Sequence, residues 1–237
     1  MKNNIIVAAI ALSTSLLSMT AKSETKTLTL MLDWFVNPNH GPVIIAKERG
    51  YFKAQGLNVD IQEPADPSMP PKLVAASKVD LGISYQPTLT INVAAGLPLI
   101  RSATLIAAPL NTLMVLDNNK INDLSDLKGK KIGIAMAGNE EASIGTMLQT
   151  VGLTYKDVKI INVGWALSSS LASGRVDAIW GGLRNFEANQ LALEGFTAKS
   201  FFPDVYGVPL YDELRFVAIA LTYDRAVILC FHKAIGQ

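Results

Sequence analysis

"ASKVDLGISY" at residues 76–85 and "ASGRVDAIWG" at residues 172–181 share one pattern, and that pattern decides the fold we expect. Each segment runs from the end of a predicted helix through a polar turn into Val-Asp and a short apolar strand. They lie near the middle of the two halves of the chain. The echo therefore indicates two similarly built lobes.

Strand and helix patterns alternate on both sides of this echo. Residues 27–32 ("TLTLML") and 56–62 read as strands, and residues 41–52 between them read as a helix. Strands that alternate with helices predict a mostly parallel sheet flanked by helices on both faces. We expect an α/β chain with one lobe over residues 24–111. A second lobe, including a return of the chain to the hinge, is expected over residues 112–222.

Four segments that follow predicted strands are candidate walls of a cleft between these lobes. Ligands of open parallel sheets bind beyond the carboxyl ends of the strands. The segments are residues 33–40, 85–86, 136–139 and 180–187. The first of them, within "LDWFVNPNHGP", contains a carboxylate, an indole, two asparagines and an imidazole. The sequence therefore predicts a polar and aromatic pocket.

The composition is that of a globular protein and argues against a nucleic-acid binder. The 237 residues carry a formal net charge of +1, and 17% of them are charged. A nucleic-acid-binding domain would carry a basic face. The single cysteine, Cys230, excludes an intrachain disulfide and a cysteine-rich metal site. We expect no bound metal and no cofactor.

Residues 1–23 have the layout of a cleavable secretory signal peptide. Lys2 precedes an apolar run over residues 5–17, and a small-residue region follows, with cleavage expected after Ala21 or Ser23. The apolar run is too short for an ordinary transmembrane span. No cysteine lies near the cleavage region to carry a lipid anchor. We therefore expect export to the periplasm.

Several longer segments make a family recognisable. Those that resemble periplasmic substrate-binding proteins of ABC importers are "AKERGYFKAQGLNVDI", "LVAASKVDLGISY", "LSDLKGKKIGI" and "LASGRVDAIWGG". "LDWFVNPNH" with "GGLRNFE" narrows the resemblance to the branch related to fungal thiamine pyrimidine synthase. That branch includes formylaminopyrimidine- and hydroxymethylpyrimidine-binding proteins of thiamine salvage. The resemblance covers residues 27–222.

The resemblance implies a type II, two-lobe Venus-flytrap fold that closes on a 4-amino-2-methylpyrimidine. It assigns ligand contacts to Asp33, Trp34, Tyr85 and Glu187. Aromatic faces can sandwich the flat ring, and a carboxylate can accept charge-assisted hydrogen bonds from its exocyclic amine and a protonated ring nitrogen. Glu187 is the first candidate for that carboxylate and Asp33 the second. The family also implies an ABC permease and ATPase at the inner membrane as partners.

Each of these residues also has a purely structural interpretation. Asp33 is a residue type that caps a turn after a strand, and Trp34 and Tyr85 could be ordinary lobe aromatics. Glu187, taken without the motif, reads as a solvated helix residue. The second-rank candidates for ligand contact, which could equally order a loop, fill the core or begin a helix, are Asn39, His40, Trp180 and Asn139.

Two other functions compete with pyrimidine binding. Resemblance to the fungal synthase would call for a cysteine-rich iron motif and a lysine for pyridoxal phosphate, but the chain has one cysteine and two histidines. It contains no GxSxG, HExxH or P-loop, so we expect no catalytic residues and no enzyme. A sulfonate or nitrate binder would need basic residues, whereas the expected lining is acidic and aromatic. The loop at 135–143 has one glycine and two glutamates and is not expected to hold a phosphate.

The C-terminal segment departs from the family pattern. Family members continue beyond "FVAIALT" with further helices, whereas residues 223–237, "YDRAVILCFHKAIGQ", do not read as an amphipathic helix of the expected kind. Cys230 and His232 read as tail residues outside any site. Our hypothesis is a shortened product with an atypical tail.

Overall fold

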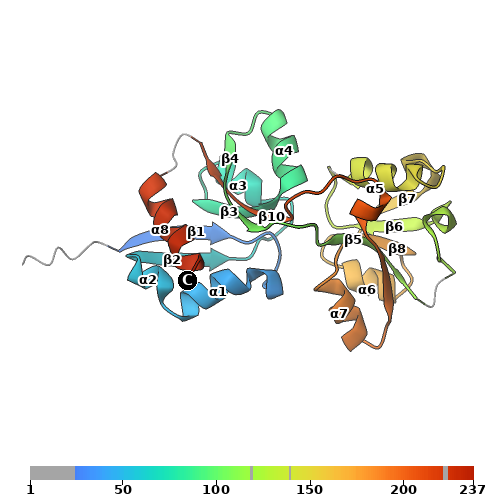
Figure 1. Cartoon of the computed structure of the whole chain (residues 1–237), viewed down its shortest axis with the longest axis horizontal. Helices are drawn as coiled ribbons and strands as arrows, with labels where there is room; N and C mark the ends of the chain where they lie inside the picture. The colour runs from blue at the N-terminus through green and yellow to red at the C-terminus, as the bar shows by residue number, and fades with distance from the viewer. Residues whose placement is uncertain (1–24, 118–119, 139, 221–223) are drawn as a thin grey trace, which may run out of the picture.

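The computed structural model describes residues 25–117, 120–138, 140–220 and 224–237. These residues form two five-stranded sheets, each in its own lobe (Figure 1). The expected signal peptide and the second-rank candidate Asn139 lie outside the described residues. None of the helices in the described part has the length and apolar character needed to cross a membrane.

The first sheet has the strand order β2-β1-β3-β10-β4. β1 (Lys26–Met31) pairs in parallel with β2 (Leu57–Gln62) on one side and β3 (Leu81–Tyr85) on the other. β10 (Leu214–Ile219) pairs antiparallel with β3 and with β4 (Leu99–Ile106). Four strands therefore run one way and β10 runs against them.

The second sheet repeats this plan in the order β7-β6-β8-β5-β9. β6 (Lys131–Ile134) pairs in parallel with β7 (Lys159–Asn162) and β8 (Ala178–Leu183). β5 (Asn111–Leu116) pairs antiparallel with β8 and with β9 (Ala198–Phe201). β3 and β8, which hold the echoed strands, occupy equivalent places. The predicted α/β fold with two similar, mostly parallel lobes is confirmed, with one antiparallel strand in each sheet.

Helices cover both faces of the first sheet because alternate strand residues point to opposite sides. Leu30 of β1 lies in one core and the adjacent Met31 in the other. The helices whose residues fill the first of these cores are α1 (Gly41–Glu48), α2 (Tyr51–Ala54) and α8 (Arg225–Ile235). Those on the opposite face are α3 (Pro70–Ala75) and α4 (Gln86–Ala94).

The second lobe is layered in the same way. Its first core is covered by α5 (Glu140–Gln149) and the 3-10 turns η2 (Leu124–Leu127) and η3 (Tyr155–Asp157). Its second core lies under α6 (Leu167–Ala172) and α7 (Glu187–Leu193). Two further 3-10 turns are η1 (Pro38–His40), in the first lobe, and η4 (Pro203–Tyr206), which contacts α5.

The expectation that residues 223–237 form an atypical, non-amphipathic tail is wrong for the helix that begins at Arg225. Asp224 caps α8 by accepting hydrogen bonds from the backbone N–H groups of residues 226 and 227. Ile228 and Phe231 are buried, and the Phe231 ring stacks on Phe52 of α2 at 5.2 Å. Apolar residues recur at spacings of three and four, which is the helical period. The segment is part of the first lobe (Figure 1).

The chain crosses between the lobes twice. It leaves the first sheet after β4 and enters the second at β5, and it returns between β9 and β10 (Figure 1). β10, which falls within the range 112–222, thus pairs in the first sheet as the return strand. Residues of both crossings lie beside the carboxyl ends of β3 and β8, where a ligand cleft is expected.

Candidate ligand-binding cleft between the lobes

A cavity lies where the two lobes meet. It contains about 690 Å³ of empty space, part of which is open to solvent. The first lobe contributes Trp34, Tyr85 and Pro87 to its lining, and the second lobe contributes residues that include Trp180 and Glu187. The crossing segments contribute Asn111, Tyr211 and Glu213. The cavity is therefore built from both lobes and from the hinge between them.

Four of the residues predicted from the sequence line this cavity. They are Trp34, Tyr85, Glu187 and the second-rank candidate Trp180. Trp34 follows β1 and Tyr85 ends β3, as parallel-sheet topology predicts, whereas Trp180 lies within β8, which continues to Leu183. Trp180 also belongs to the core of the second lobe, so the structural and the ligand-contact interpretations hold together for it.

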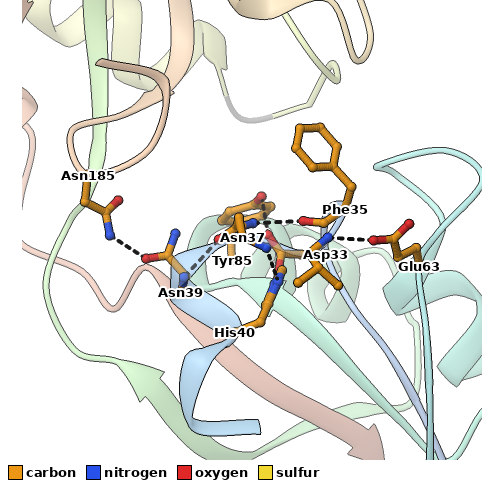
Figure 2. Close-up of polar contacts among 9 residues, drawn as sticks. Asp33, Phe35, Asn37, Asn39, His40, Glu63, Tyr85 and Asn185 are labelled. Carbon is orange, nitrogen blue, oxygen red and sulfur yellow. Dashed lines mark hydrogen bonds and ion pairs between the residues drawn. The ribbon is translucent and has the colours of Figure 1, made fainter. Parts of the chain in front are cut away.

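The cavity lining does not include Asp33, which is hydrogen-bonded to Tyr85 and His40 (Figure 2). Asp33 is 2% exposed. Tyr85 donates a hydrogen bond of 2.7 Å from its hydroxyl to Asp33 Oδ2, and His40 Nε2 lies 2.9 Å from Asp33 Oδ1. Asp33 thus holds the Tyr85 ring in place, which is a role that the sequence analysis did not assign to it.

His40 is fully buried and belongs to the same network (Figure 2). Its Nδ1 accepts a hydrogen bond of 3.2 Å from the backbone N–H of Asn37. An Nδ1 that accepts leaves the proton on Nε2, so Nε2–H donates to Asp33. Asn37 also caps η1 by accepting from the backbone N–H of Asn39 at 3.0 Å. His40 therefore orders the loop that presents Trp34 to the cavity.

Asn39 makes a contact between the lobes. Its side-chain Oδ1 accepts a hydrogen bond of 2.6 Å from Asn185 Nδ2, which follows β8 in the second lobe (Figure 2). Aromatic contacts cross beside it: Trp34 lies 4.4 Å from Trp165, and Phe35 lies 5.6 Å from Phe186, between ring centroids. These contacts join the two lobes beside the cavity.

Glu187 is the first residue of α7 and is 3% exposed. Its Oε2 accepts a hydrogen bond of 2.7 Å from the backbone N–H of Leu183, near the end of β8. Burial raises the pKa of Glu187 to about 7, and the negative charge of Asp33 also raises it. Hydrogen bonds from the backbone N–H groups of Leu183 and of Glu187 itself act in the opposite direction. The interpretation of Glu187 as a solvated helix residue is wrong, because the start of α7 is packed into the cleft.

Glu213, which was not predicted from the sequence, is 1% exposed and lines the cavity. Its Oε2 accepts hydrogen bonds from the backbone N–H groups of Leu110 at 2.6 Å and Asn111 at 2.8 Å. It therefore joins the segment that returns to the first lobe before β10 to the segment that leaves it before β5. Burial raises the pKa of Glu213 to about 7, opposed by the two backbone N–H groups and raised further by the charge of Asp33. Its position directly before an apolar strand was the only signal in the sequence.

Two more cavity residues were also missed. Asn111 Oδ1 accepts a hydrogen bond of 2.9 Å from the backbone N–H of Gly181, which fixes the amide beside β8. Burial, then the charge and hydrogen bond of Glu213, raise the pKa of Tyr211 well above its ordinary value, so its phenol stays neutral. Trp34, which was predicted from the sequence to contact the ligand, has a buried Nε1–H without a hydrogen-bond partner among the described residues.

The loop after β6 brings Ala135 and Met136 to the cavity, and its helix start is already occupied by a carboxylate. Glu140 Oε2 accepts a hydrogen bond of 2.6 Å from the backbone N–H of Gly138. A carboxylate beside the first turn of a helix is favoured by the helix dipole. No group of three His, Cys, Asp or Glu side chains in the described ranges is placed to hold a metal ion.

Comparisons with known proteins agree with this architecture. A thiamine biosynthesis protein of Haemophilus influenzae is 53% identical over 191 residues, which is 81% of this chain and 61% of the relative. The formylaminopyrimidine-binding protein of Halalkalibacterium halodurans is 36% identical over 193 residues, 81% of this chain and 58% of the relative. The chain thus spans about three fifths of the length of these relatives.

A solved structure shows the same fold. The alkanesulfonate-binding protein SsuA of Xanthomonas axonopodis pv. citri, bound to MOPS, superposes with a TM-score of 0.68 at 17% identity, over 89% of this chain and 72% of its own. The fold is therefore that of the two-lobe periplasmic binding proteins. The family model described as NMT1/THI5 like matches residues 37–235, which is most of the chain. The chain belongs to the NMT1/THI5-like family.

Proposed function

We propose that the chain is the solute-binding component of an ABC importer and captures a thiamine-related aminopyrimidine of the formylaminopyrimidine or hydroxymethylpyrimidine type. The observation that carries this proposal is a cleft whose described lining has aromatic rings and two carboxyls, Glu187 and Glu213, and no Lys, Arg or His. The relatives support it, since one is a formylaminopyrimidine-binding protein and another a thiamine biosynthesis protein.

The ring of the ligand would lie among Trp34, Tyr85 and Trp180. Each aromatic contact of this kind adds about 0.5–1.5 kcal/mol beyond the burial of apolar surface. Because the Tyr85 hydroxyl donates to Asp33, Tyr85 offers the ligand its ring face. Glu187 would accept a hydrogen bond from the exocyclic amine.

The cellular setting follows from the same proposal. A two-lobe binding protein collects its ligand outside the inner membrane and delivers it, in the closed form, to a permease with an ATPase beneath it. The signal-peptide pattern at residues 1–23 supports a periplasmic location. Ligand would shift the population toward the closed lobes because it contacts both of them.

A pyrimidine synthase-like enzyme is the alternative within the same family. Its iron and pyridoxal phosphate chemistry would need a set of residues that this sequence does not supply, with one cysteine and two histidines. His40 is fully buried against Asp33 and Asn37, outside the cavity lining. We therefore propose binding without catalysis.

A sulfonate or nitrate cargo is the second alternative. Such an anion needs basic side chains or free helix N-termini. The cavity lining drawn from the described residues includes Glu187 and Glu213 and no Lys, Arg or His. Two buried carboxyls would repel the anion, which favours an amine-bearing heterocycle.

Thermal unfolding of the purified chain tests the proposal. Formylaminopyrimidine or hydroxymethylpyrimidine at 100 times its dissociation constant should stabilise the fold by about 2.7 kcal/mol, and an alkanesulfonate should not. Glu187→Ala should abolish the shift, whereas Glu194→Ala, on the exposed end of the same helix, should keep it. A cooperative transition that responds to the sulfonate and to neither pyrimidine would overturn the assignment.

A further inference from the structure

The described residues that line the cavity include two buried carboxyls and no basic side chain. Glu187 comes from the start of α7, and Glu213 comes from the returning crossing. The two residues are 3% and 1% exposed. Among the described residues that line the cavity, none is Lys, Arg or His. A negative charge on either carboxyl therefore has no cationic partner among the described lining residues.

The hydrogen bonds that these carboxyls receive are all from neutral groups. Glu187 accepts from the backbone N–H of Leu183, and Glu213 accepts from those of Leu110 and Asn111. Neutral donors satisfy oxygen lone pairs but leave the charge itself uncompensated, and a buried carboxylate without a counter-charge is costly. Burial accordingly raises the pKa of both groups to about 7.

The other acid near the cavity does not relieve this imbalance. Asp33 is occupied by the Tyr85 hydroxyl and by His40 Nε2–H, and its charge raises the pKa of both cavity carboxyls. A ligand that brings a positive charge would remove the penalty. A neutral ligand would leave it in place.

The cavity also offers one donor that is not used. Trp34 is 6% exposed, lines the cavity, and its Nε1–H has no hydrogen-bond partner among the described residues. A buried donor without a partner costs about 1–3 kcal/mol, so the ligand should also carry an acceptor. A ring nitrogen of a pyrimidine is such an acceptor. The site therefore favours a ligand with a hydrogen-bond acceptor in its ring and a positively charged group next to the ring.

We propose that the cleft selects the pyrimidine whose side arm is a primary amine, 4-amino-5-aminomethyl-2-methylpyrimidine, over its neutral formyl and hydroxymethyl counterparts, with Glu213 and Glu187 as the residues that determine this specificity. The inference rests on the proposed function. An ammonium group carries one positive charge and three donors. The formyl derivative has one N–H and a carbonyl oxygen that would face carboxylates, and the hydroxymethyl derivative has no charge.

Isothermal titration calorimetry of the purified chain with the three pyrimidines at pH 7.5 tests this specificity. The amine should bind at least about tenfold more tightly than the formyl and hydroxymethyl compounds, because hydrogen bonds to charged groups are roughly twice as strong as neutral ones. Glu213→Gln and Glu187→Gln preserve the shape of each side chain and remove its charge. Each should weaken binding of the amine about tenfold and change binding of the hydroxymethyl compound about threefold or less.

Glu194→Gln is the matched control, because Glu194 is exposed at the end of α7 and outside the cavity lining. It should leave all three affinities unchanged. If the pyrimidines bind but the amine has no advantage in the wild-type chain, the charge-selection proposal fails while the pyrimidine-binding proposal survives. If no pyrimidine binds a cooperatively folded chain, both fail. The wild-type comparison needs no variant and decides the question even if a glutamine variant does not fold.

Discussion

The Tyr85 hydroxyl donates to Asp33 Oδ2 at 2.7 Å, across 52 positions of sequence. Asp33, which the sequence predicted as a ligand contact, thus holds the aromatic ring of Tyr85 in position. Its second oxygen lies 2.9 Å from His40 Nε2, so both oxygens have partners within the first lobe. The loop after β1 serves the site by positioning rings, and the carboxyls that face the cavity come from other segments.

Tyr85→Phe should separate the effect of the Tyr85–Asp33 hydrogen bond on stability from the effect of the Tyr85 ring on ligand binding. Loss of the hydroxyl leaves buried Asp33 with one partner fewer and should lower the free energy of unfolding by about 1–3 kcal/mol. The ring remains, so ligand affinity should change little, whereas Tyr85→Ala should abolish binding. Urea unfolding and calorimetry on both variants check this. If Tyr85→Phe lost affinity without losing stability, the hydroxyl would have to contact the ligand directly.

The hydrogen bond between Asn39 and Asn185 should affect closure without contact with the ligand. The two amides join the lobes at 2.6 Å. Asn39→Ala and Asn185→Ala should each weaken ligand binding, and a double-mutant cycle should give a coupling energy of about 0.5–3 kcal/mol. Small-angle scattering should show a larger radius of gyration for the ligand-free variants. Strictly additive effects would mean that the two amides do not act together in solution.

Phe231→Ala should show that the C-terminal helix is part of the first lobe. Phe231 is fully buried and its ring contacts those of Phe52 and Phe216, so the substitution should cost about 3–5 kcal/mol of unfolding free energy. Leu229, on the same helix, is 57% exposed, and Leu229→Ala should change stability by about 0.5 kcal/mol or less. Urea unfolding measures both. Equal, small effects would contradict the packing of α8.

The stability of the ligand-free chain should fall as pH rises through the titration of the cavity carboxyls. The pKa of Glu187 and of Glu213 is about 7 in the fold, against an ordinary value of 4.5. A raised carboxyl pKa means that the folded chain binds protons more tightly between these values. Unfolding free energy should therefore decrease from pH 4.5 to about 7, by up to about 3 kcal/mol for each group.

A double variant isolates this effect from other titrations. Burial lowers the pKa of His232, which acts in the opposite direction near pH 6.5. The lowered pKa of exposed acids such as Asp224 matters only near and below 3.8. The difference in unfolding free energy between the wild type and E187Q/E213Q cancels both contributions. As pH rises from 5 to 8, the unfolding free energy of the wild type should decrease relative to that of the double variant. A constant difference would show that the two carboxyls do not titrate in this range.

Local sequence patterns could predict the lobes and part of the site. The echo at β3 and β8 follows from strand and turn chemistry that repeats in both halves. Trp34 and Tyr85 lie at the ends of parallel strands, which meet at one edge of the sheet. Glu213 could not be found this way. Its place at the cavity depends on β10 returning to pair with β3 and β4, which is a long-range choice of topology.

The role of Asp33 and the packing of α8 were not predicted from the sequence, and the reasons differ. Nothing in the spacing of Asp33 and Tyr85 predicts a hydrogen bond, because the contact arises only when β1 and β3 pair. In α8 the helical signal was present, since Ile228, Phe231 and Ile235 recur at spacings of three and four. There the error was in the interpretation of the pattern, and Phe52 and Phe216 supply the surface that the pattern needs.

Tryptophan fluorescence during a titration with formylaminopyrimidine tests the central claim most directly. The chain has three tryptophans: Trp34 and Trp180 line the cavity, and the ring centroid of Trp165 lies 4.4 Å from that of Trp34. A stacked pyrimidine should change the emission saturably with one ligand per chain, and Glu187→Ala should remove the response. A folded chain whose emission stays constant with every thiamine-related pyrimidine, yet responds to an alkanesulfonate, would contradict the account.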